Sequence, residues 1–316
     1  MNWDAIVLGG GAAGLSAAVV LARTGVRVVV VEDRSPRNAP AGHMHGFISR
    51  DGMSPAELLQ VSREEIIRYG GRLLAAKAVE VTGIAPDDFK VELADGSVLN
   101  APALLLATGL RDQLPEIPGI EALWGTLVHH CPHCHGREVA GERIAVIGGA
   151  NAPMSIHQAG LMRRYSDKVT FYLGGITLDP QHRASLEAVG VVVSEASVTS
   201  VAADVDNSAG LVLTLNDGSI VQHDAAFVAP IMQPRDEMFA GLELARVPGT
   251  RWLQTDASGR TSRFGVWAAG NIANPRAQVI TAAGEGSAAA IDLSGYLLER
   301  DLGLAGEGVI ASWYQR

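Results

Sequence analysis

A strand, a glycine-rich turn, a helix and a second strand open this chain, and this order constrains the fold more than any other feature. The apolar run 5–8 leads into the glycine motif 9–14, an alanine-rich helix is expected over residues 15–23, and the apolar run 28–31 ends at Glu32. A β-α-β unit with G-x-G-x-x-G at the turn and an acid about twenty residues later is typical of dinucleotide-binding domains. The N-terminus therefore predicts an α/β domain built on a parallel sheet.

Each glycine of the motif has a physical task. Gly9 permits the tight turn, Gly11 lets the backbone approach a pyrophosphate, and Gly14 allows the helix to pack closely on the strand. The helix N-terminus offers amide donors to the phosphates, and Glu32 would accept hydrogen bonds from ribose hydroxyls. The alternative is a glycine-rich turn that serves packing alone. The neighbouring residues that we predict to belong to the same cofactor site are Ala12, Ala13 and Asp33.

The strand-then-glycine pattern recurs in the middle of the chain. Residues 143–147 form an apolar run that leads into a glycine pair, which indicates a second dinucleotide-type domain. Pro115 and Pro118 mark the start of this domain, and Pro248 with Gly249 marks its end. The expected fold is α/β, with two Rossmann-like three-layer domains, the second inserted in the first. Residues 1–116 and 249–316 are expected to form one domain and residues 117–248 the other.

Small-residue turns follow two further strands of the outer domain. A buried strand over 104–106 ends in the turn 107–109, and a strand that begins at Val266 leads to a similar turn. A long apolar helix is expected to start near residue 278, where its positive end could stabilise a reduced flavin. The residues of these segments that we predict to contact the cofactor are Ala107, Thr108, Gly109, Gly270, Asn271, Gln278 and Val279.

The chain has only two cysteines, Cys131 and Cys134. A C-x-x-C pair closes a small disulfide loop and suits dithiol/disulfide exchange. A histidine can stabilise a thiolate or carry its proton near neutral pH. We give a catalytic role only to His135, which directly follows the second cysteine. Four histidines surround the pair in the sequence: His129, His130, His133 and His135.

A structural zinc site and a chance pair of core cysteines are the alternatives for this motif. Structural zinc usually draws its ligands from two separated clusters, and no second Cys/His cluster follows downstream. We therefore predict no metal site. The N-terminus lacks the basic and apolar regions of an export signal, and no apolar stretch reaches membrane-spanning length, so we expect a cytoplasmic protein without a transmembrane helix. In that reducing compartment a lone C-x-x-C pair favours redox chemistry.

The charge balance limits the class of partner. The formal net charge is -9, and the basic residues form no long run. Phosphate backbones require concentrated Lys and Arg, so nucleic acid is not an expected partner.

The motifs taken together resemble the low-molecular-weight thioredoxin reductase family over nearly the whole chain. The resemblance implies an FAD domain split between the N- and C-terminal thirds, an inserted pyridine-nucleotide-like domain that bears the disulfide, and a homodimer. It implies that Cys134 is the sulfur nearer the flavin. It also adds three residues to the predicted FAD site, namely Asn38, His45 and Val79.

Within that family the chain is similar to the dithiol oxidases of disulfide natural products such as gliotoxin and holomycin. The reductases place an Asp after the second cysteine, whereas the oxidases have a His, as at His135 here. The segments 37–40 and 43–47 resemble the flavin-side loop of the oxidases. Asn271 stands where the reductases carry an Asp that binds the ribityl chain of the flavin.

The central domain lacks the features that select NADPH. The reductases bind the 2'-phosphate with a His-Arg-Arg-type motif after the second strand of this domain, but here the run 169–173 is followed by Gly174, Gly175 and Ile176. Pro153 stands at the last small position of the glycine loop and is expected to alter the entry into the helix.

These features predict an FAD-dependent oxidase that forms an intramolecular disulfide in a small-molecule dithiol. A substrate thiolate would attack Cys131, Cys134 would pass electrons to FAD, and O2 would accept them to give hydrogen peroxide. His135 would act as acid and base. The alternatives are an NADPH-dependent thioredoxin or disulfide reductase and a flavin-bearing redox sensor that turns nothing over.

Overall fold

The computed structural model of the protein describes residues 3–83, 88–204 and 210–303, and these form two compact units. The first unit takes in the chain up to Ala39, Gly46–Arg111 and the chain from Gln233 onward. The second takes in Pro40–His45 and Asp112–Met232. The chain passes between the units within β8 (Leu110–Gln113) and β17 (Ile231–Pro234), which pair as a two-stranded sheet.

These crossings differ from the domain limits expected at 116/117 and 248/249. The prolines and glycines near the expected limits lie in turns inside a unit. The chain passes from one unit to the other within the paired strands β8 and β17, where no turn residue marks a boundary in the sequence. The segment Pro40–His45 belongs to the second unit although its neighbours on both sides belong to the first. No local sequence pattern predicts that this short segment belongs to the second unit.

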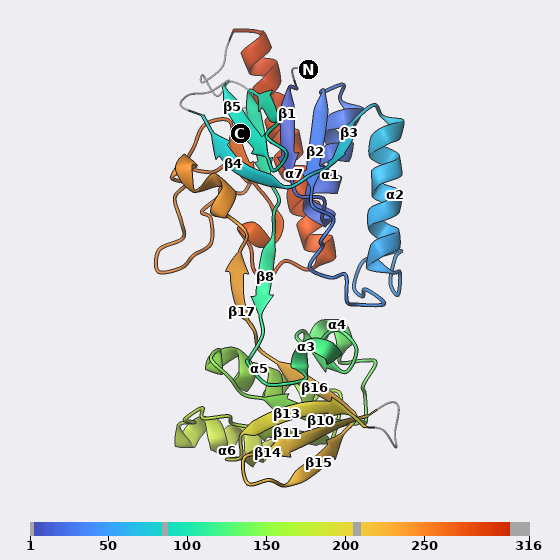
Figure 1. Cartoon of the computed structure of the whole chain (residues 1–316), viewed down its shortest axis with the longest axis vertical. Helices are drawn as coiled ribbons and strands as arrows, with labels where there is room; N and C mark the ends of the chain where they lie inside the picture. Colours follow the sequence, from blue (N-terminus) through green and yellow to red (C-terminus); the bar gives the residue numbers. More distant parts are fainter. Residues whose placement is uncertain (1–2, 84–87, 205–209, 304–316) are drawn as a thin grey trace. The chain divides into compact units, whose positions relative to one another are not determined.

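A five-stranded parallel sheet forms the centre of the first unit (Figure 1). Its strands carry short, continuous apolar runs, which is typical of strands buried on both faces. Register pairs Ile6 with Val29 on one side and with Leu104 on the other. The strand order is β18 (Val266–Ala268), β7 (Ala103–Leu106), β1 (Ala5–Leu8), β2 (Val28–Glu32) and β3 (Arg72–Ala75).

Helices cover one face of this sheet and an antiparallel sheet covers the other, so the first unit has three layers. Alternate side chains of each strand point to opposite faces. Val7 packs against α1 (Ala12–Arg23) and α7 (Val279–Asp301), with α2 (Pro55–Arg68) beside them, whereas Ile6 and Leu8 face the second sheet. That sheet consists of β4 (Ala78–Thr82), β5 (Phe89–Leu93) and β6 (Val98–Ala101), and the 3-10 helix η1 (Glu237–Leu242) packs with it (Figure 1).

The second unit repeats this architecture around a five-stranded parallel sheet. Ile144 and Val146 face the helices α5 (Ala152–Met162) and α6 (Pro180–Ala188), while Ala145 and Ile147 face an antiparallel sheet. The parallel order is β12 (Val192–Ser194), β11 (Lys168–Tyr172), β10 (Arg143–Ile147), β16 (Ala225–Val228) and β9 (Val128–His129). The antiparallel sheet is β13 (Val198–Ala203), β14 (Leu211–Leu215) and β15 (Ile220–His223), and two short helices precede β10: α3 (Ile120–Leu123) and α4 (Pro132–His135).

The predicted α/β fold with paired Rossmann-like layers is confirmed by these two units, and so is each expected strand named above. Pro153 lies in the first turn of α5, where a proline costs no hydrogen bond. The expected change in the entry into this helix stays a prediction. None of the described helices is both long and apolar enough to cross a membrane.

Helices α1 and α7 approach each other so closely that a glycine is required between them. A Cβ placed on Gly286 of α7 would lie 2.0 Å from the carbonyl oxygen of Ala13 in α1. The contact is backbone against backbone, so no side-chain rotation can relieve a substitution. This packing fixes the N-terminal turn of α1 against the C-terminal helix.

We predict that Gly286→Ala destabilises the protein by about 2 kcal/mol or more, because overpacking at a rigid backbone contact forces the two helices apart. Gly284→Ala is the matched control, since a Cβ at Gly284 meets nothing within 4 Å and that position is exposed. The control should keep or gain up to about 1 kcal/mol from helix propensity. Urea unfolding midpoints measure both changes, and equal midpoints for the two variants would contradict the prediction.

A buried histidine in the second unit makes stability depend on pH. Tyr172 Oη lies 2.9 Å from His223 Nε2, and both residues are buried between the two sheets. Burial, and then the positive charge of Arg143, lower the pKa of His223 to about 4. In the unfolded chain a histidine titrates near pH 6.5, so the unfolded state binds more protons between about pH 6.5 and 4 and stability falls as the pH falls through that window.

We predict that the free energy of unfolding of the wild type drops by about 1–2 kcal/mol more between pH 7 and pH 5 than that of His223→Gln, which lacks this titration. Urea titrations at the two pH values measure the difference. Parallel losses in the wild type and the variant would show that His223 is not a source of the pH dependence.

Candidate active site

The first turn of α1 is built by glycines that pack directly on neighbouring backbone. Gly9 has a φ of +111°, and a Cβ on it would lie 2.2 Å from the carbonyl oxygen of Ala107. A Cβ on Gly14 would lie 2.0 Å from the carbonyl oxygen of Gly9. The structure therefore brings the predicted motifs 9–14 and 107–109 into contact.

Gly11 faces open space at the N-terminus of α1. It is the N-cap residue of the helix, no side chain caps it, and a Cβ built on it meets no atom within 4 Å. Ala12 and Ala13 form the first turn behind it, and that turn contains no acidic residue. Free amides and the positive end of the helix dipole suit a phosphate group, so this turn fits the pyrophosphate of a dinucleotide.

Glu32 lies beside this turn at the end of β2 and is 4% exposed. The guanidinium of Arg63, from α2, donates to both of its carboxylate oxygens at 2.8 Å. A Cβ on Gly10 would lie 2.0 Å from Glu32 Oε2, so Gly10 leaves the room that this carboxylate occupies. Each oxygen keeps further acceptor capacity for a ribose hydroxyl. Sequence reasoning missed Arg63, because α2 lies far from Glu32 in the chain.

The turn 107–109 is tied to the segment that follows β17. Thr108 Oγ1 donates to the carbonyl oxygen of Arg235 at 2.6 Å, and the Arg235 amide donates to the Gly109 carbonyl oxygen at 3.0 Å. The Arg235 guanidinium also lies 3.8 Å from the carboxylate of Asp33. These bonds hold two predicted cofactor segments in one place.

The side-chain amide of Asn271 is hydrogen-bonded within its own loop. Its side-chain amide donates to the carbonyl oxygens of Asn274 and Ala277 at 3.0 and 2.9 Å, and its Oδ1 accepts from Arg37 at 3.3 Å. Gly270, at φ +75°, places this loop against Ala13, and Gln278 and Val279 then start α7. Of the groups of Asn271, the oxygen retains acceptor capacity towards a ligand.

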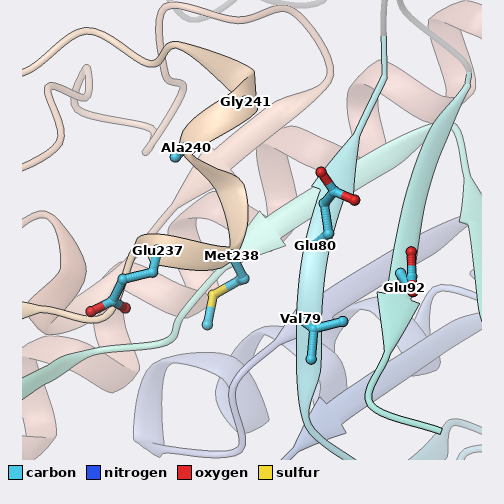
Figure 2. A pocket seen from close by; sticks show the side chains of 7 residues that line it. All are labelled: Val79, Glu80, Glu92, Glu237, Met238, Ala240 and Gly241. Atoms are coloured by element: carbon cyan, nitrogen blue, oxygen red, sulfur yellow. The ribbon is translucent and has the colours of Figure 1, made fainter. Parts of the chain in front are cut away.

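Val79 lines a pocket of about 390 Å³ in the first unit, between β4, β5 and η1 (Figure 2). Three carboxylates, from Glu80, Glu92 and Glu237, line the same pocket. Phosphates would be repelled there. The predicted flavin contact of Val79 stays a prediction, and this pocket does not suit the pyrophosphate.

The redox pair forms a disulfide at the start of α4. Cys131 is the N-cap residue of this four-residue helix, its Cα lies 5.2 Å from that of Cys134, and both residues are half-buried. The amides of Cys134 and His135 both donate to the Cys131 carbonyl oxygen, at 3.0 and 3.1 Å. The turn is closed at Gly136, where a Cβ would lie 2.6 Å from the Tyr165 ring.

His135 stacks on His129, a histidine for which the sequence predicts no catalytic role. The rings of His129 and His135 are 4.4 Å apart and 17° from parallel, and the Phe227 ring is tilted against His129 with its centroid 5.5 Å away. Burial, and then the neighbouring His135, lower the pKa of His129 to about 4, so His129 is neutral at physiological pH. Burial also lowers the pKa of His135, while Glu138 acts in the opposite direction. Strand pairing of β9 with β16 places His129 there, and no local signal identifies it.

Gln158 of α5 fixes the chain between β9 and the disulfide. Its fully buried amide donates to the carbonyl oxygens of His130 and Val228, which joins the strand β16 to the residue before Cys131. His133, in contrast, is exposed. Sequence reasoning missed Gln158 because a glutamine in a helix carries no pattern of its own.

His45 does not share a unit with the other residues predicted to bind the cofactor. It lies in the second unit, where its Nε2 is 3.3 Å from Glu138 Oε1. Asn38 is half-buried in the first unit. The assignment of His45 to the flavin stays a prediction, and its observed partner is beside the redox turn.

In the second unit the glycine turns after β10 and β11 pack against each other. A Cβ on Gly174, which follows β11, would lie 2.7 Å from the Gly148 carbonyl oxygen. On α6, Arg183 is paired with the carboxylates of Glu187 and Glu195. Across the described ranges no group of three or more His, Cys, Asp or Glu side chains could hold a metal ion.

Residues 3–286 match the pyridine nucleotide-disulphide oxidoreductase family. The chain belongs to this family. Two relatives named thioredoxin reductase are each 30% identical: sirT of Leptosphaeria maculans, over 95% of this chain and 96% of its own, and tcpT of Claviceps purpurea, over 85% and 86%. The solved structure of HlmI is 40% identical, covers 99% of this chain and 97% of its own, and superposes with a TM-score of 0.90. An oxidoreductase from Agrobacterium tumefaciens is 32% identical, with 94% and 99% covered and a TM-score of 0.86.

The resemblance to thioredoxin reductase-like proteins is confirmed by these comparisons, and the protein is a flavin-dependent thiol/disulfide oxidoreductase. The site fits the flavin dinucleotide on its own evidence. The open turn at Gly11 would hold the pyrophosphate, and the buried carboxylate of Glu32 would hold the ribose.

We predict that Gly10→Ala lowers the affinity for FAD by about tenfold, because the new methyl group displaces the carboxylate of Glu32. The ratio of flavin to protein absorbance after dialysis measures the loss. Gly284→Ala again serves as the control, and full retention of flavin by both variants would remove Glu32 from the FAD site.

Proposed function

We propose that the protein is an FAD-dependent dithiol oxidase that forms an intramolecular disulfide in a small-molecule dithiol. The observation that carries this proposal is the half-buried Cys131–Cys134 disulfide with an imidazole pair, His135 on His129, beside it. An imidazole accepts a proton near neutral pH, which suits an enzyme that receives protons from substrate thiols.

The chain's own residues carry the exchange as follows. A substrate thiol loses its proton to His135, and the thiolate attacks Cys131, so that a mixed disulfide forms and Cys134 leaves as the thiolate. The second substrate thiol then gives its proton to the Cys134 thiolate and attacks the substrate sulfur of the mixed disulfide, which releases the cyclic disulfide product and Cys131 as a thiolate. His135 returns the first proton to Cys131. The substrate has lost two electrons and two protons, and the enzyme holds the Cys131/Cys134 dithiol. When bound, FAD would accept the electron pair from that dithiol and deliver it to O2, which with two protons becomes hydrogen peroxide.

The direction of the reaction follows from the electron donor that the second unit accepts. Selection of NADPH needs cations for the 2'-phosphate. Here β11 is followed by Gly174 and Gly175, and Arg183 is already paired with carboxylates. These features support a dithiol and not NADPH as the reductant. The reductase alternative predicts that NADPH reduces the flavin and that the enzyme then reduces a disulfide.

An anaerobic spectrum tests the two directions. We expect NADPH to leave the flavin of the purified protein oxidised, dithiothreitol to bleach it, and air to restore it with one equivalent of hydrogen peroxide per flavin. Rapid stoichiometric bleaching by NADPH would support the reductase instead. No response to any dithiol would support the redox sensor.

We predict that Cys131→Ser lowers dithiol turnover by at least about a thousandfold while FAD stays bound, because Cys131 receives the substrate and does not hold the cofactor. Peroxide production and the flavin spectrum measure the two effects separately. His133→Asn, an exposed change in the same turn, is the control and should turn over normally. Loss of flavin from the Cys131 variant would contradict this division of roles.

The homodimer implied by the family resemblance is also part of this proposal. Light scattering coupled to gel filtration would test it by giving the mass of the particle directly.

A further inference from the structure

The charges around His135 come from two side chains that meet each other. Glu138 follows His135 by three residues, and its Oε1 lies 3.3 Å from His45 Nε2. His45 enters from the segment Pro40–His45, whose buried Met44 is part of the same unit. A carboxylate and an imidazole from distant parts of the sequence therefore converge beside the redox turn.

Among the described residues, Glu138 and His45 are the two whose charges shift the pKa of His135. His129 of β9 covers one face of the ring and is neutral. Tyr165 lies behind Gly136, and the one titratable side chain of α5, His157, is exposed. The negative charge of Glu138 favours a protonated His135, while a protonated His45 disfavours it.

We propose that Glu138 and His45 are opposed positioning residues for His135: the Glu138 carboxylate is the counter-charge of the imidazolium that forms when His135 takes a substrate proton, and His45 competes for that carboxylate. This inference rests on the proposed function, because it assigns a proton to His135 during dithiol exchange. It reassigns His45 from the flavin to the redox turn.

The two opposed roles predict that substitutions at Glu138 and His45 shift the proton affinity of His135 in opposite directions. Glu138→Gln removes the counter-charge and keeps the shape, so His135 should hold its proton less well. His45→Gln removes the competing cation and frees the carboxylate, so His135 should hold its proton better. Glu138 is 42% exposed and His45 26%, so solvent screens the interaction. We therefore expect shifts of about half a pH unit in each direction, and smaller ones at high salt.

Two measurements detect these shifts in the titration midpoint of His135. The first is the pH dependence of the rate at which dithiothreitol bleaches the flavin anaerobically, in a stopped-flow instrument. The second is the titration of the His135 ring resonances by NMR, which needs no turnover. In both, Glu138→Gln should move the midpoint down and His45→Gln should move it up, in 20 mM salt more than in 1 M.

The control is Glu121→Gln, an exposed carboxylate of α3 in the same unit, which should leave both midpoints in place. Equal shifts in one direction for both variants, or no shift in either, would overturn the inference. A wild-type flavin that no dithiol bleaches would instead overturn the proposed function, and the NMR titration would still decide whether Glu138 and His45 act on His135. Loss of folding in either variant would show as lost dispersion of the NMR spectrum. Glu138→Asn would then replace Glu138→Gln, and His45→Asn would replace His45→Gln.

Discussion

Contact between backbones at the first turn of α1 is the constraint on which the first unit depends. Gly14 allows the helix to lie on Gly9, Gly9 allows the turn to lie on Ala107, and Gly286 allows α7 to lie on Ala13. A side chain at any of these positions would separate elements that meet through backbone atoms. The same contacts leave Gly11 facing open space with free amides, so the packing of the core and the fit to a dinucleotide have one origin.

The two units use one architecture for different tasks. Each has a parallel sheet with helices on one face and a three-stranded antiparallel sheet on the other. In the first unit the glycine turn is open and an acid lies at the end of the second strand. In the second unit the corresponding strand β11 is followed by Leu173 and two glycines, and the disulfide lies at the start of α4, after the edge strand β9. Fold alone therefore does not tell which unit handles which substrate.

Histidine gives the redox turn its character. A carboxylate after the second cysteine would donate a proton only if its pKa were strongly raised, whereas an imidazole exchanges protons near neutral pH. The neutral ring of His129 and the partly exposed Glu138 act on His135 in different ways, one by burial and one by charge. The proton affinity of this group is thus a property of the assembled unit and not of the C-x-x-C motif.

The sequence by itself determined the local features of this protein. Apolar runs and glycine spacing predicted β1, α1, β2 and the repeat at β10, and the spacing of Cys131 and Cys134 predicted their disulfide, because each depends on neighbours along the chain. Only the tertiary structure decided that Arg63 binds Glu32, that His129 stacks on His135 and that His45 meets Glu138. Those contacts join separate elements through side-chain packing, and no periodicity in the sequence encodes which side chains will meet.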